Sequence, residues 1–339
     1  MKNKVDINLL IQDPEVVSFI EKGDYSRAAK KLLEKQKETW VTLAAGYESL
    51  KLIKIKTIEF VGFSFIIQYN PARIISTSAP TDEISIRERK CFLCNENRPG
   101  EQKGIFVNDY LILGNPFPIF PEHFTIPGIE HKDQRIKNSF SDLLYFSKIL
   151  SGYYSVLYNG PKCGASAPDH LHFQAGNKSA LPFTNEYNIL KKEYGELLSA
   201  GKNVEIFGID DGLRKIICLE SSDREKLSAS FNSFYNLYAS YSDNSEPMMN
   251  IISSYEDKTG WRIAVMLRAK HRPEEFYMKG EERILFSPAG SDFGGLCITP
   301  LEKDFERFDR ELLIKIFNEV SISRELFNEI KNKIKAELI

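Results

Sequence analysis

Apolar residues recur with helical spacing through the first fifty residues of the chain. Asp24 has the kind of side chain that caps a helix N-terminus. The apolar stripe behind it consists of Ala29, Leu32, Leu33, Trp40, Leu43, Tyr47 and Leu50. This spacing mostly fits one face of a helix. We therefore predict a helical segment over residues 1–50, whose default role is to cover a sheet.

From Ile53 onward the pattern changes to short runs of β-branched and aromatic residues, which are typical of strands. Strands are predicted over Ile53–Phe60, Phe63–Gln68, Arg73–Ser76, Phe106–Leu113, His123–Ile126, Tyr153–Tyr158, His170–Gln174, Val204–Gly208, Lys215–Leu219, Met249–Tyr255 and Trp261–Leu267. Helices are predicted over Phe140–Leu150, Glu186–Leu198, Asp223–Tyr241 and the stretch behind Ser323. The strands do not alternate with helices as in βαβ units, so an α+β fold with antiparallel sheets is expected.

The order of the predicted elements partly repeats after Pro182, although no repeat is visible at the level of single residues. The polar stretch Ser199–Asn203 is the predicted boundary between the two parts. We therefore divide the chain into an N-terminal helical segment (1–50), a first half (51–200) and a second half (201–339).

Composition narrows the class of protein. The chain has 339 residues, with 45 basic and 47 acidic side chains and a net charge of −2. A near-neutral chain lacks the basic face that nucleic-acid binding needs. No apolar run approaches the roughly 20 residues that span a bilayer, and the N-terminus has no signal-peptide core. Five cysteines do not form a secreted disulfide framework. A cytoplasmic protein without membrane or nucleic-acid partners is expected.

Candidate chemistry is concentrated between Gly160 and Gly176. Within this stretch His170, His172 and Gln174 alternate with two apolar residues. Residues two apart on a strand point to the same face of a sheet, so these three polar side chains are expected to project together. A neutral imidazole can attack phosphorus, and the Gln174 amide can donate a hydrogen bond to a phosphoryl oxygen. The alternative is a pair of structural histidines on a half-buried strand.

A loop of small residues directly precedes the two histidines. Gly160 and Gly164 allow main-chain N–H groups to approach an anion closely, and the Ser166 hydroxyl adds a donor. Lys162 lies in the same loop, and we include it with Gly164 among the substrate-binding candidates. A phosphate-binding loop beside an imidazole favours the catalytic interpretation over the structural one.

The segment His170-Leu-His-Phe-Gln174 resembles the His-x-His-x-Gln signature of the transferase and phosphorylase branch of the histidine-triad superfamily. This branch contains galactose-1-phosphate uridylyltransferase, diadenosine tetraphosphate phosphorylase and the GDP-hexose phosphorylases. Gly164-Ala-Ser-Ala-Pro168 is similar to the phosphate-contacting Gly-x-Ser-x-Pro stretch of these enzymes, but here Asp169 intervenes before the first histidine. The resemblance covers roughly residues 60–180 well and the second half in outline. It implies two histidine-triad-like halves with antiparallel sheets covered by helices.

The resemblance also assigns roles to single residues. It implies that His172 is the nucleophile that takes the nucleotidyl group, with His170, Gln174 and Ser166 as the other catalytic candidates. Gln174 stands where the hydrolase branch has a third histidine, which favours transfer over hydrolysis. Gln68-Tyr-Asn-Pro-Ala-Arg73 is similar to a nucleotide-site strand of the GDP-hexose phosphorylases. The nucleotide-binding candidates from this strand and from the following Asn–Pro turn are Gln68, Asn70, Arg73 and Asn115.

The pair Cys91 and Cys94 forms a Cys-x-x-Cys motif, which in a cytosolic protein is metal-binding, redox-active or merely buried. The βαβ context of a redox motif is missing, and zinc needs two further ligands, which only histidines can supply here. The stretch resembles the zinc loop of bacterial uridylyltransferases, which implies His170 as a ligand and a fourth ligand after the next strand. His131 fits that place best, and His123 is the alternative. A structural Zn²⁺ bound by Cys91, Cys94, His131 and His170 is therefore expected.

The expected function is nucleotidyl transfer from a nucleoside diphosphate sugar, with a GDP-hexose favoured, through a covalent intermediate on His172. Phosphate or a sugar 1-phosphate would be the acceptor. The alternatives are a dinucleotide phosphorylase or hydrolase and a zinc-stabilised nucleotide-binding protein without turnover. A homodimer is suggested only by analogy with related two-domain enzymes.

Overall fold

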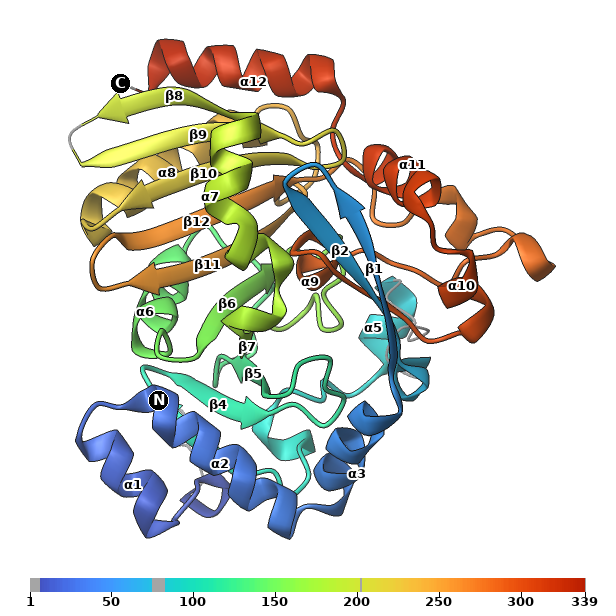
Figure 1. Cartoon of the computed structure of the whole chain (residues 1–339). Coiled ribbons are helices and arrows are strands. Elements are labelled where there is room, and N and C mark those ends of the chain that lie inside the picture. Colours follow the sequence, from blue (N-terminus) through green and yellow to red (C-terminus); the bar gives the residue numbers. More distant parts are fainter. Residues whose placement is uncertain (1–6, 75–82, 202, 339) are drawn as a thin grey trace.

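The computed structural model describes residues 7–74, 83–201 and 203–338. Its centre is a ten-stranded sheet in the order β3-β4-β5-β7-β6-β11-β12-β10-β9-β8 (Figure 1). The strands of the first half are β3 (Gly104–Val107), β4 (Tyr110–Gly114), β5 (His123–Pro127), β6 (Tyr154–Asn159) and β7 (His172–Asn177). Those of the second half are β8 (Gly195–Gly201), β9 (Val204–Asp210), β10 (Lys215–Ser221), β11 (Met249–Glu256) and β12 (Gly260–Leu267). All pairings within this sheet are antiparallel.

The two halves of the sheet repeat one topology. Counted from the outer edge inward, the first half runs β3-β4-β5-β7-β6 and the second β8-β9-β10-β12-β11. The halves join where β6 pairs with β11, from Val156 with Ser253 to Asn159 with Asn250. In each half a helix follows the third strand along the chain: α6 (Phe140–Ile149) connects β5 to β6, and α8 (Arg224–Ala239) connects β10 to β11. The predicted α+β class with antiparallel sheets is confirmed, and both halves belong to one continuous sheet.

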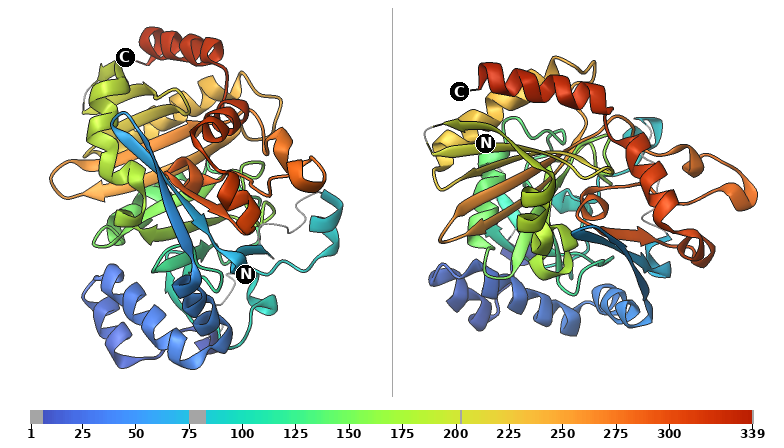
Figure 2. Two further views of the ribbon diagram at one scale, coloured as in Figure 1. Left: turned by 45° about the vertical axis from the view of Figure 1, so that its right-hand side comes forward. Right: turned by 45° about the horizontal axis from the view of Figure 1, so that its top comes forward.

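One face of the sheet is covered by helices from three parts of the chain. They are α2 (Tyr25–Thr39), α6, α8 and α12 (Arg324–Glu337), and their apolar stripes share one core cluster with the strands. Phe140 of α6 stacks on Phe231 of α8, with ring centroids 3.7 Å apart, and so ties the two connecting helices together. The N-terminal helices and α12 lie at opposite ends of the molecule (Figures 1 and 2).

The other face is covered by a small sheet and further helices. The small sheet has the order β1-β2-β13, formed by β1 (Lys54–Phe60), β2 (Phe63–Tyr69) and β13 (Leu296–Thr299). β13 runs parallel to β2, which is an exception to the predicted antiparallel pairing. The helices that share the core cluster of this small sheet are α7 (Pro182–Tyr194), α9 (Gly290–Phe293), α10 (Glu302–Arg307) and α11 (Arg310–Val320). The helices α1 (Pro14–Glu21) and α3 (Val41–Ser49) instead share the core cluster of α2, and α5 (Glu83–Glu88) precedes the two cysteines. Short 3-10 turns occupy Ile7–Leu9, Leu50–Leu52, Pro71–Arg73, Asn95–Asn97, Lys178–Ala180, Glu274–Phe276 and Gly280–Glu282.

Local side chains explain several element boundaries. The predicted cap Asp24 accepts the Arg27 N–H, and Ser323 likewise caps α12. Between residues 7 and 50 the chain forms helices, but these are separate helices rather than one continuous stripe. The predicted strand Phe106–Leu113 is instead the hairpin β3–β4, because Asn108 and Asp109 both adopt positive φ (48° and 61°), as a two-residue turn requires.

Three further predicted boundaries differ from the observed elements. The helix predicted to reach Leu198 ends at Tyr194, because Gly195 takes up extended backbone and begins β8; only glycine fits there, since a Cβ would lie 2.2 Å from the Lys191 carbonyl oxygen. The predicted strand from Arg73 begins as a 3-10 turn, and its last two positions lie outside the described residues. In the predicted boundary stretch Ser199–Asn203, β8 ends at Gly201 and β9 begins directly afterwards at Val204, and the division near residue 200 stays a prediction.

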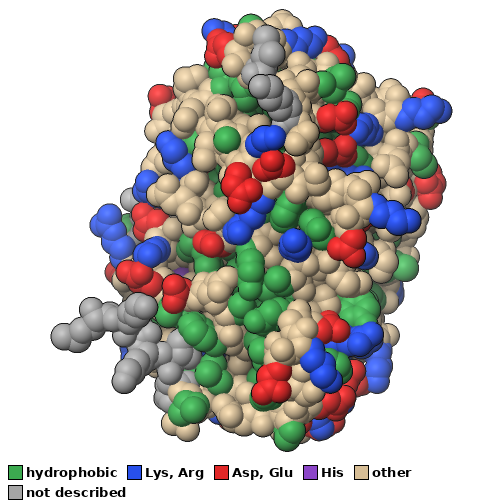
Figure 3. All heavy atoms as spheres, turned by 90° about the vertical axis from the view of Figure 1, so that its left-hand side faces the viewer, with side chains coloured by type: hydrophobic (Ala, Val, Ile, Leu, Met, Phe, Trp, Pro, Cys, Tyr) green, Lys and Arg blue, Asp and Glu red, His purple; other side chains and the backbone are tan. Residues whose placement is uncertain are grey.

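Surface charge is mixed on the side of the molecule shown in Figure 3. Lys and Arg side chains are interspersed with Asp and Glu, and apolar side chains gather over the lower part of this side. No continuous basic surface is visible on that side. None of the described helices combines the length and the apolar character needed to cross a bilayer.

Candidate active site and metal centre

The two motif histidines lie at the start of β7 but do not share a strand face. β7 begins at His172, and His170 lies before it in the loop, where its N–H donates to the Ala167 carbonyl. The prediction that His170, His172 and Gln174 project together is therefore wrong for His170. The alternation of polar and apolar residues begins two positions before the strand does, so the spacing alone does not mark where the strand starts.

His172 is buried, with 3% of its surface exposed, and its ring is oriented by the main chain. Its Nδ1 lies 2.8 Å from the His170 carbonyl oxygen, which can only accept, so Nδ1 carries the proton. Nε2 is then unprotonated, and within the described residues it has no hydrogen-bond partner. Burial lowers the pKa of His172 to about 4, so the ring is neutral near pH 7. The arrangement leaves a lone pair on Nε2 available for nucleophilic attack.

Gln174 lies two residues further along β7, and its amide is oriented by His123. His123 Nε2 is 3.1 Å from Gln174 Oε1, while His123 Nδ1 accepts the Ile119 N–H at 3.4 Å. The His123 Nε2–H therefore donates to Gln174, which turns the Gln174 NH₂ group outward as a donor. Burial, followed by the charge of Arg73, lowers the pKa of His123 to about 3, so His123 stays neutral. His123 thus contacts the catalytic candidate rather than the two cysteines.

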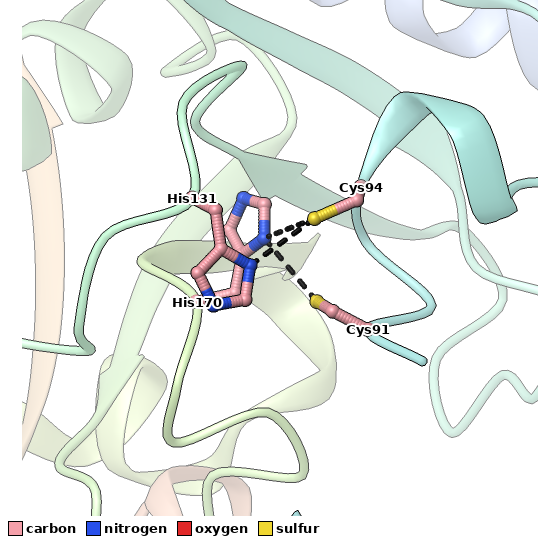
Figure 4. Close-up of side chains that lie close together, drawn as sticks. All are labelled: Cys91, Cys94, His131 and His170. Atoms are coloured by element: carbon pink, nitrogen blue, oxygen red, sulfur yellow. Dashed lines mark hydrogen bonds between the residues drawn. The ribbon is translucent and has the colours of Figure 1, made fainter. Parts of the chain in front are cut away.

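Cys91, Cys94, His131 and His170 come together from three separate segments (Figure 4). Their ligand atoms all lie within 4.8 Å of one another. His170 Nδ1 is 3.3 Å from Cys91 Sγ and 3.6 Å from Cys94 Sγ, and His131 Nδ1 is 3.1 Å from Cys94 Sγ. Ligands around a tetrahedral zinc lie about 3.5 Å from one another. The predicted four residues therefore form a Cys₂His₂ group with suitable spacing.

The outer nitrogens of both histidines in this Cys₂His₂ group face acceptors. His170 Nε2 lies 2.8 Å from the Gly128 carbonyl oxygen, and His131 Nε2 lies 3.7 Å from Asp169 Oδ2. The Gly128 carbonyl holds the proton on the outer nitrogen of His170 and turns its Nδ1 lone pair toward a metal, whereas the contact of His131 with Asp169 is longer than a hydrogen bond. Asp169, the residue that departs from the family pattern, accepts from Arg89 at 2.9 Å. Asp169 therefore lies between Arg89 and a histidine of the group.

The cysteine pair also fits a cation. Burial is the main cause that raises the pKa of Cys94 to about 12, and the neighbouring Cys91 is the second cause. A thiolate at Cys94 is therefore stable only if a positive ion compensates it. The Cys91–Cys94 turn is closed by the Cys94 N–H to the Cys91 carbonyl at 3.3 Å and by the Asn97 side chain to the same carbonyl at 2.9 Å. The donor set and its supports match a closed, structural zinc site.

The loop of small residues packs against the second half of the chain. Gly164 has φ +89°, and a Cβ there would lie 2.6 Å from the Ala289 Cβ, so only glycine fits. Ser166 is exposed, and its carbonyl accepts from Arg89 at 3.3 Å. Lys162 is exposed and donates to Asn244 at 2.8 Å, so it is engaged outside the loop. Packing thus explains why residue 164 is a glycine. The phosphate-binding roles of Ser166 and Lys162 stay predictions.

The predicted nucleotide strand converges on the Pro-rich turn between β4 and β5. The Asn70 amide donates to the Pro118 carbonyl at 3.3 Å, and Arg73 donates to the Phe117 carbonyl at 2.7 Å. Gln68 Nε2 and Asn70 Oδ1 are buried and have no hydrogen-bond partner within the described residues. Buried polar atoms are normally paired, so these two are suited to a ligand.

Asn115 has a different position from the other nucleotide-binding candidates. Its Oδ1 accepts the Phe117 N–H at 2.8 Å, and its amide donates to Thr125 at 3.1 Å. Both side-chain groups therefore shape the turn. A direct contact of Asn115 with substrate stays a prediction.

One residue that contacts His172 was not predicted from the sequence. Gln134, which is fully buried, accepts the His172 N–H at 2.8 Å and donates to the His172 carbonyl at 3.0 Å. It lies in the polar stretch between β5 and α6, where a single glutamine carries no recognisable signal. Its hydrogen bonds to His172 depend on the folded structure and have no local signal in the sequence.

Comparison with known proteins agrees with this architecture. Residues 32–177 match a family model described as a domain of unknown function (DUF4922), and residues 190–338 match one described as the GDPGP1-like C-terminal domain. Among solved structures, the chain is similar to yeast Ap4A phosphorylase Apa2 in complex with AMP, with 17% identity, a TM-score of 0.56, and coverage of 87% of this chain and 96% of that chain. The chain therefore has a fold similar to that of yeast Ap4A phosphorylase Apa2.

A second structure of yeast Ap4A phosphorylase Apa2 matches the same fold. It shares 18% identity and a TM-score of 0.53, with coverage of 83% of this chain and 93% of that chain. None of the curated proteins matches this chain by sequence. The α+β fold that the resemblance implied is therefore confirmed. At such low identity the match concerns the fold, and the residue roles rest on the geometry described above.

Proposed function

We propose that the protein transfers nucleotidyl groups through a covalent intermediate on His172. The observation that carries this proposal is the orientation of its ring, with the Nδ1 proton on the His170 carbonyl and an unprotonated Nε2. A buried neutral imidazole with one fixed tautomer is prepared to attack an electrophile.

The proposed reaction has two half-reactions. His172 Nε2 attacks the α-phosphorus of the donor, a P–N bond forms, and the P–O bond to the leaving phosphate group breaks. An acceptor phosphate, either inorganic or on a sugar, then attacks the same phosphorus, and the P–N bond breaks to restore the imidazole. The His170 carbonyl stabilises the positive charge that the ring carries in between. Ping-pong kinetics are the expected signature.

Neighbouring groups support this chemistry. The Gln174 NH₂ group, turned outward by His123, is suited to donate to a phosphoryl oxygen. Gln174 cannot serve as a general acid near pH 7, because an amide does not release a proton there. Ser166 and the N–H groups near Gly164 are the proposed further donors. A site without a general acid suits leaving groups that are already good, such as phosphates.

We propose a GDP-hexose as the favoured donor. Support comes from the Gln68–Arg73 strand, with its two unpartnered buried polar atoms, and from the match of residues 190–338 to the GDPGP1-like C-terminal domain. A dinucleotide phosphorylase is the second candidate. It is favoured by the likeness of most of the chain to yeast Ap4A phosphorylase.

We further propose that Cys91, Cys94, His131 and His170 hold a zinc ion. All four coordination positions would be protein ligands, so the ion would be structural. When bound, it would fix the loop that presents the His170 carbonyl to His172.

The test is an activity assay with separated products. The protein is incubated with GDP-glucose, GDP-mannose, UDP-glucose, ADP-glucose or diadenosine tetraphosphate, with and without inorganic phosphate. The expected result is phosphate-dependent formation of a nucleoside diphosphate by the wild type and none by His172→Asn. Release of nucleoside monophosphate without phosphate would indicate a hydrolase. Thermal stabilisation by one of these compounds without any product would indicate a binding protein.

A further inference from the structure

We infer that Gln134 is a positioning residue that holds the main chain of His172 in register. Its side chain makes three hydrogen bonds to main-chain atoms: Oε1 accepts the His172 N–H at 2.8 Å, and Nε2 donates to the carbonyls of His172 at 3.0 Å and Asn159 at 2.9 Å. Gln134 is fully buried, so it does not contact substrate directly. The inference rests on the proposed function, because it concerns the presentation of the nucleophile.

The position of Gln134 is explained by the sheet. β6 and β7 pair from Tyr154 with Asn177 to Leu157 with Gln174. Continuing this register by two residues places Asn159 opposite His172, where an antiparallel pair would exchange main-chain hydrogen bonds. The strands separate before this point, and the Gln134 amide lies between them. It bonds to both main chains as a peptide group of a neighbouring strand would.

The loop that carries Gln134 also carries the metal-site residue His131. The loop runs beside the segment before β7, with hydrogen bonds from the Gly128 N–H to the Leu171 carbonyl at 3.0 Å and from the Leu171 N–H to the Lys132 carbonyl at 2.6 Å. The Gln134 side chain extends this series of hydrogen bonds to His172. The loop therefore connects the Cys₂His₂ group to the nucleophile by main-chain contacts.

The direction of the His172 Nε2 depends on this connection. The ring is held by its Nδ1 bond to the His170 carbonyl, and that bond requires residues 170 and 172 to keep their relative positions. Without the Gln134 amide, the His172 N–H and the Asn159 carbonyl lose their partners in a buried place. A displacement of the nucleophile of about 1 Å can cost about 100-fold in rate.

The experiment compares Gln134→Met with Gln36→Met. Gln36 is the matched control, because it is 1% exposed and accepts the Lys103 N–H at 2.9 Å in the N-terminal helices, away from His172. Each substitution removes a buried amide of similar size. Gln134→Glu is the second variant, because its buried carboxyl group in the protonated form keeps the acceptor and one donor hydrogen in place of two. The readouts are the single-turnover rate of nucleotidyl-His172 formation, donor affinity, melting temperature and zinc content.

We expect Gln134→Met to slow formation of the adduct about 100-fold with donor affinity within about twofold of the wild type. Gln134→Glu should be slowed less. Gln36→Met should lower the melting temperature but form the adduct at the wild-type rate. If Gln134→Met does not fold, a slowed Gln134→Glu with normal donor affinity supports the inference in its place.

Two results would overturn the inference, and they are distinguishable. If the wild type forms the adduct and the Gln134 variants form it as fast as Gln36→Met, Gln134 is only a structural residue and the proposed function stands. If the wild type forms no adduct with any donor of the panel, the proposed function fails and the inference fails with it.

Discussion

Glu246 is a buried carboxylic acid whose protonation should control stability near neutral pH. Only 2% of its surface is exposed. It accepts the Ile136 N–H at 3.0 Å and the Tyr158 hydroxyl at 2.9 and 3.0 Å. Burial is the main cause that raises the pKa of Glu246 from its ordinary 4.5 to about 7, although these two donors oppose it.

The size of the effect follows from proton linkage. Between pH 4.5 and pH 7 the folded protein keeps a proton on Glu246 that the unfolded chain has released. The free energy of unfolding therefore falls as pH rises through this range. The difference of 7 − 4.5 between the two pKa values corresponds to about 3 kcal/mol in total, of which about 2.5 kcal/mol is lost between pH 5 and pH 8.

Glu246→Gln removes this titration while keeping the shape of the side chain. Equilibrium urea unfolding at several pH values between 5 and 8 measures the difference in unfolding free energy between variant and wild type. This difference should shift in favour of the variant by about 2.5 kcal/mol from pH 5 to pH 8. Glu281→Gln is the control, since the Glu281 side chain is 92% exposed and lies in water, and it should follow the wild-type profile. A constant difference between Glu246→Gln and wild type across the range would refute the reasoning.

Three further substitutions test other parts of the account. Cys94→Ser should abolish stoichiometric zinc binding measured by elemental mass spectrometry, whereas Cys163→Ala, a buried cysteine outside the Cys₂His₂ group, should leave it intact. Gly164→Ala should lower the free energy of unfolding by about 1 kcal/mol or more beyond Gly212→Ala, because both have positive φ but only the first meets a neighbouring side chain; equal losses in urea unfolding would contradict the packing argument. His123→Leu should slow formation of the nucleotidyl adduct by releasing the amide that it orients, and loss of zinc in this variant would instead identify His123 as a metal ligand.

Much of the fold could be predicted from the sequence because its elements have strong local signals. The helix behind Ser323 and the hairpin from Met249 to Leu267 follow from side-chain periodicity and capping, and both are present. The division of Phe106–Leu113 into two strands depends on two residues with positive φ, which a run of apolar residues conceals. Pairing of β6 with β11 joins distant parts of the chain, so no local pattern could have predicted one continuous sheet.

Some residues of the candidate site could be predicted from the sequence, and others depend on how distant strands pair. The grouping of Cys91, Cys94, His131 and His170 came from the family resemblance, and the structure brings the four residues together. The position of Gln134 could not be predicted, because its role arises where β6 and β7 separate. The same separation explains why His170 lies off the strand that its spacing indicated.

The most direct test of the central claim is the intact mass of the protein after incubation with a donor and no acceptor. Wild type and His172→Asn are each exposed to GDP-glucose, GDP-mannose, UDP-glucose, ADP-glucose and diadenosine tetraphosphate. The account predicts that the wild type gains the mass of one nucleoside monophosphate from at least one donor and that the variant gains none. An adduct on His172→Asn, or no wild-type adduct with any donor, would contradict it.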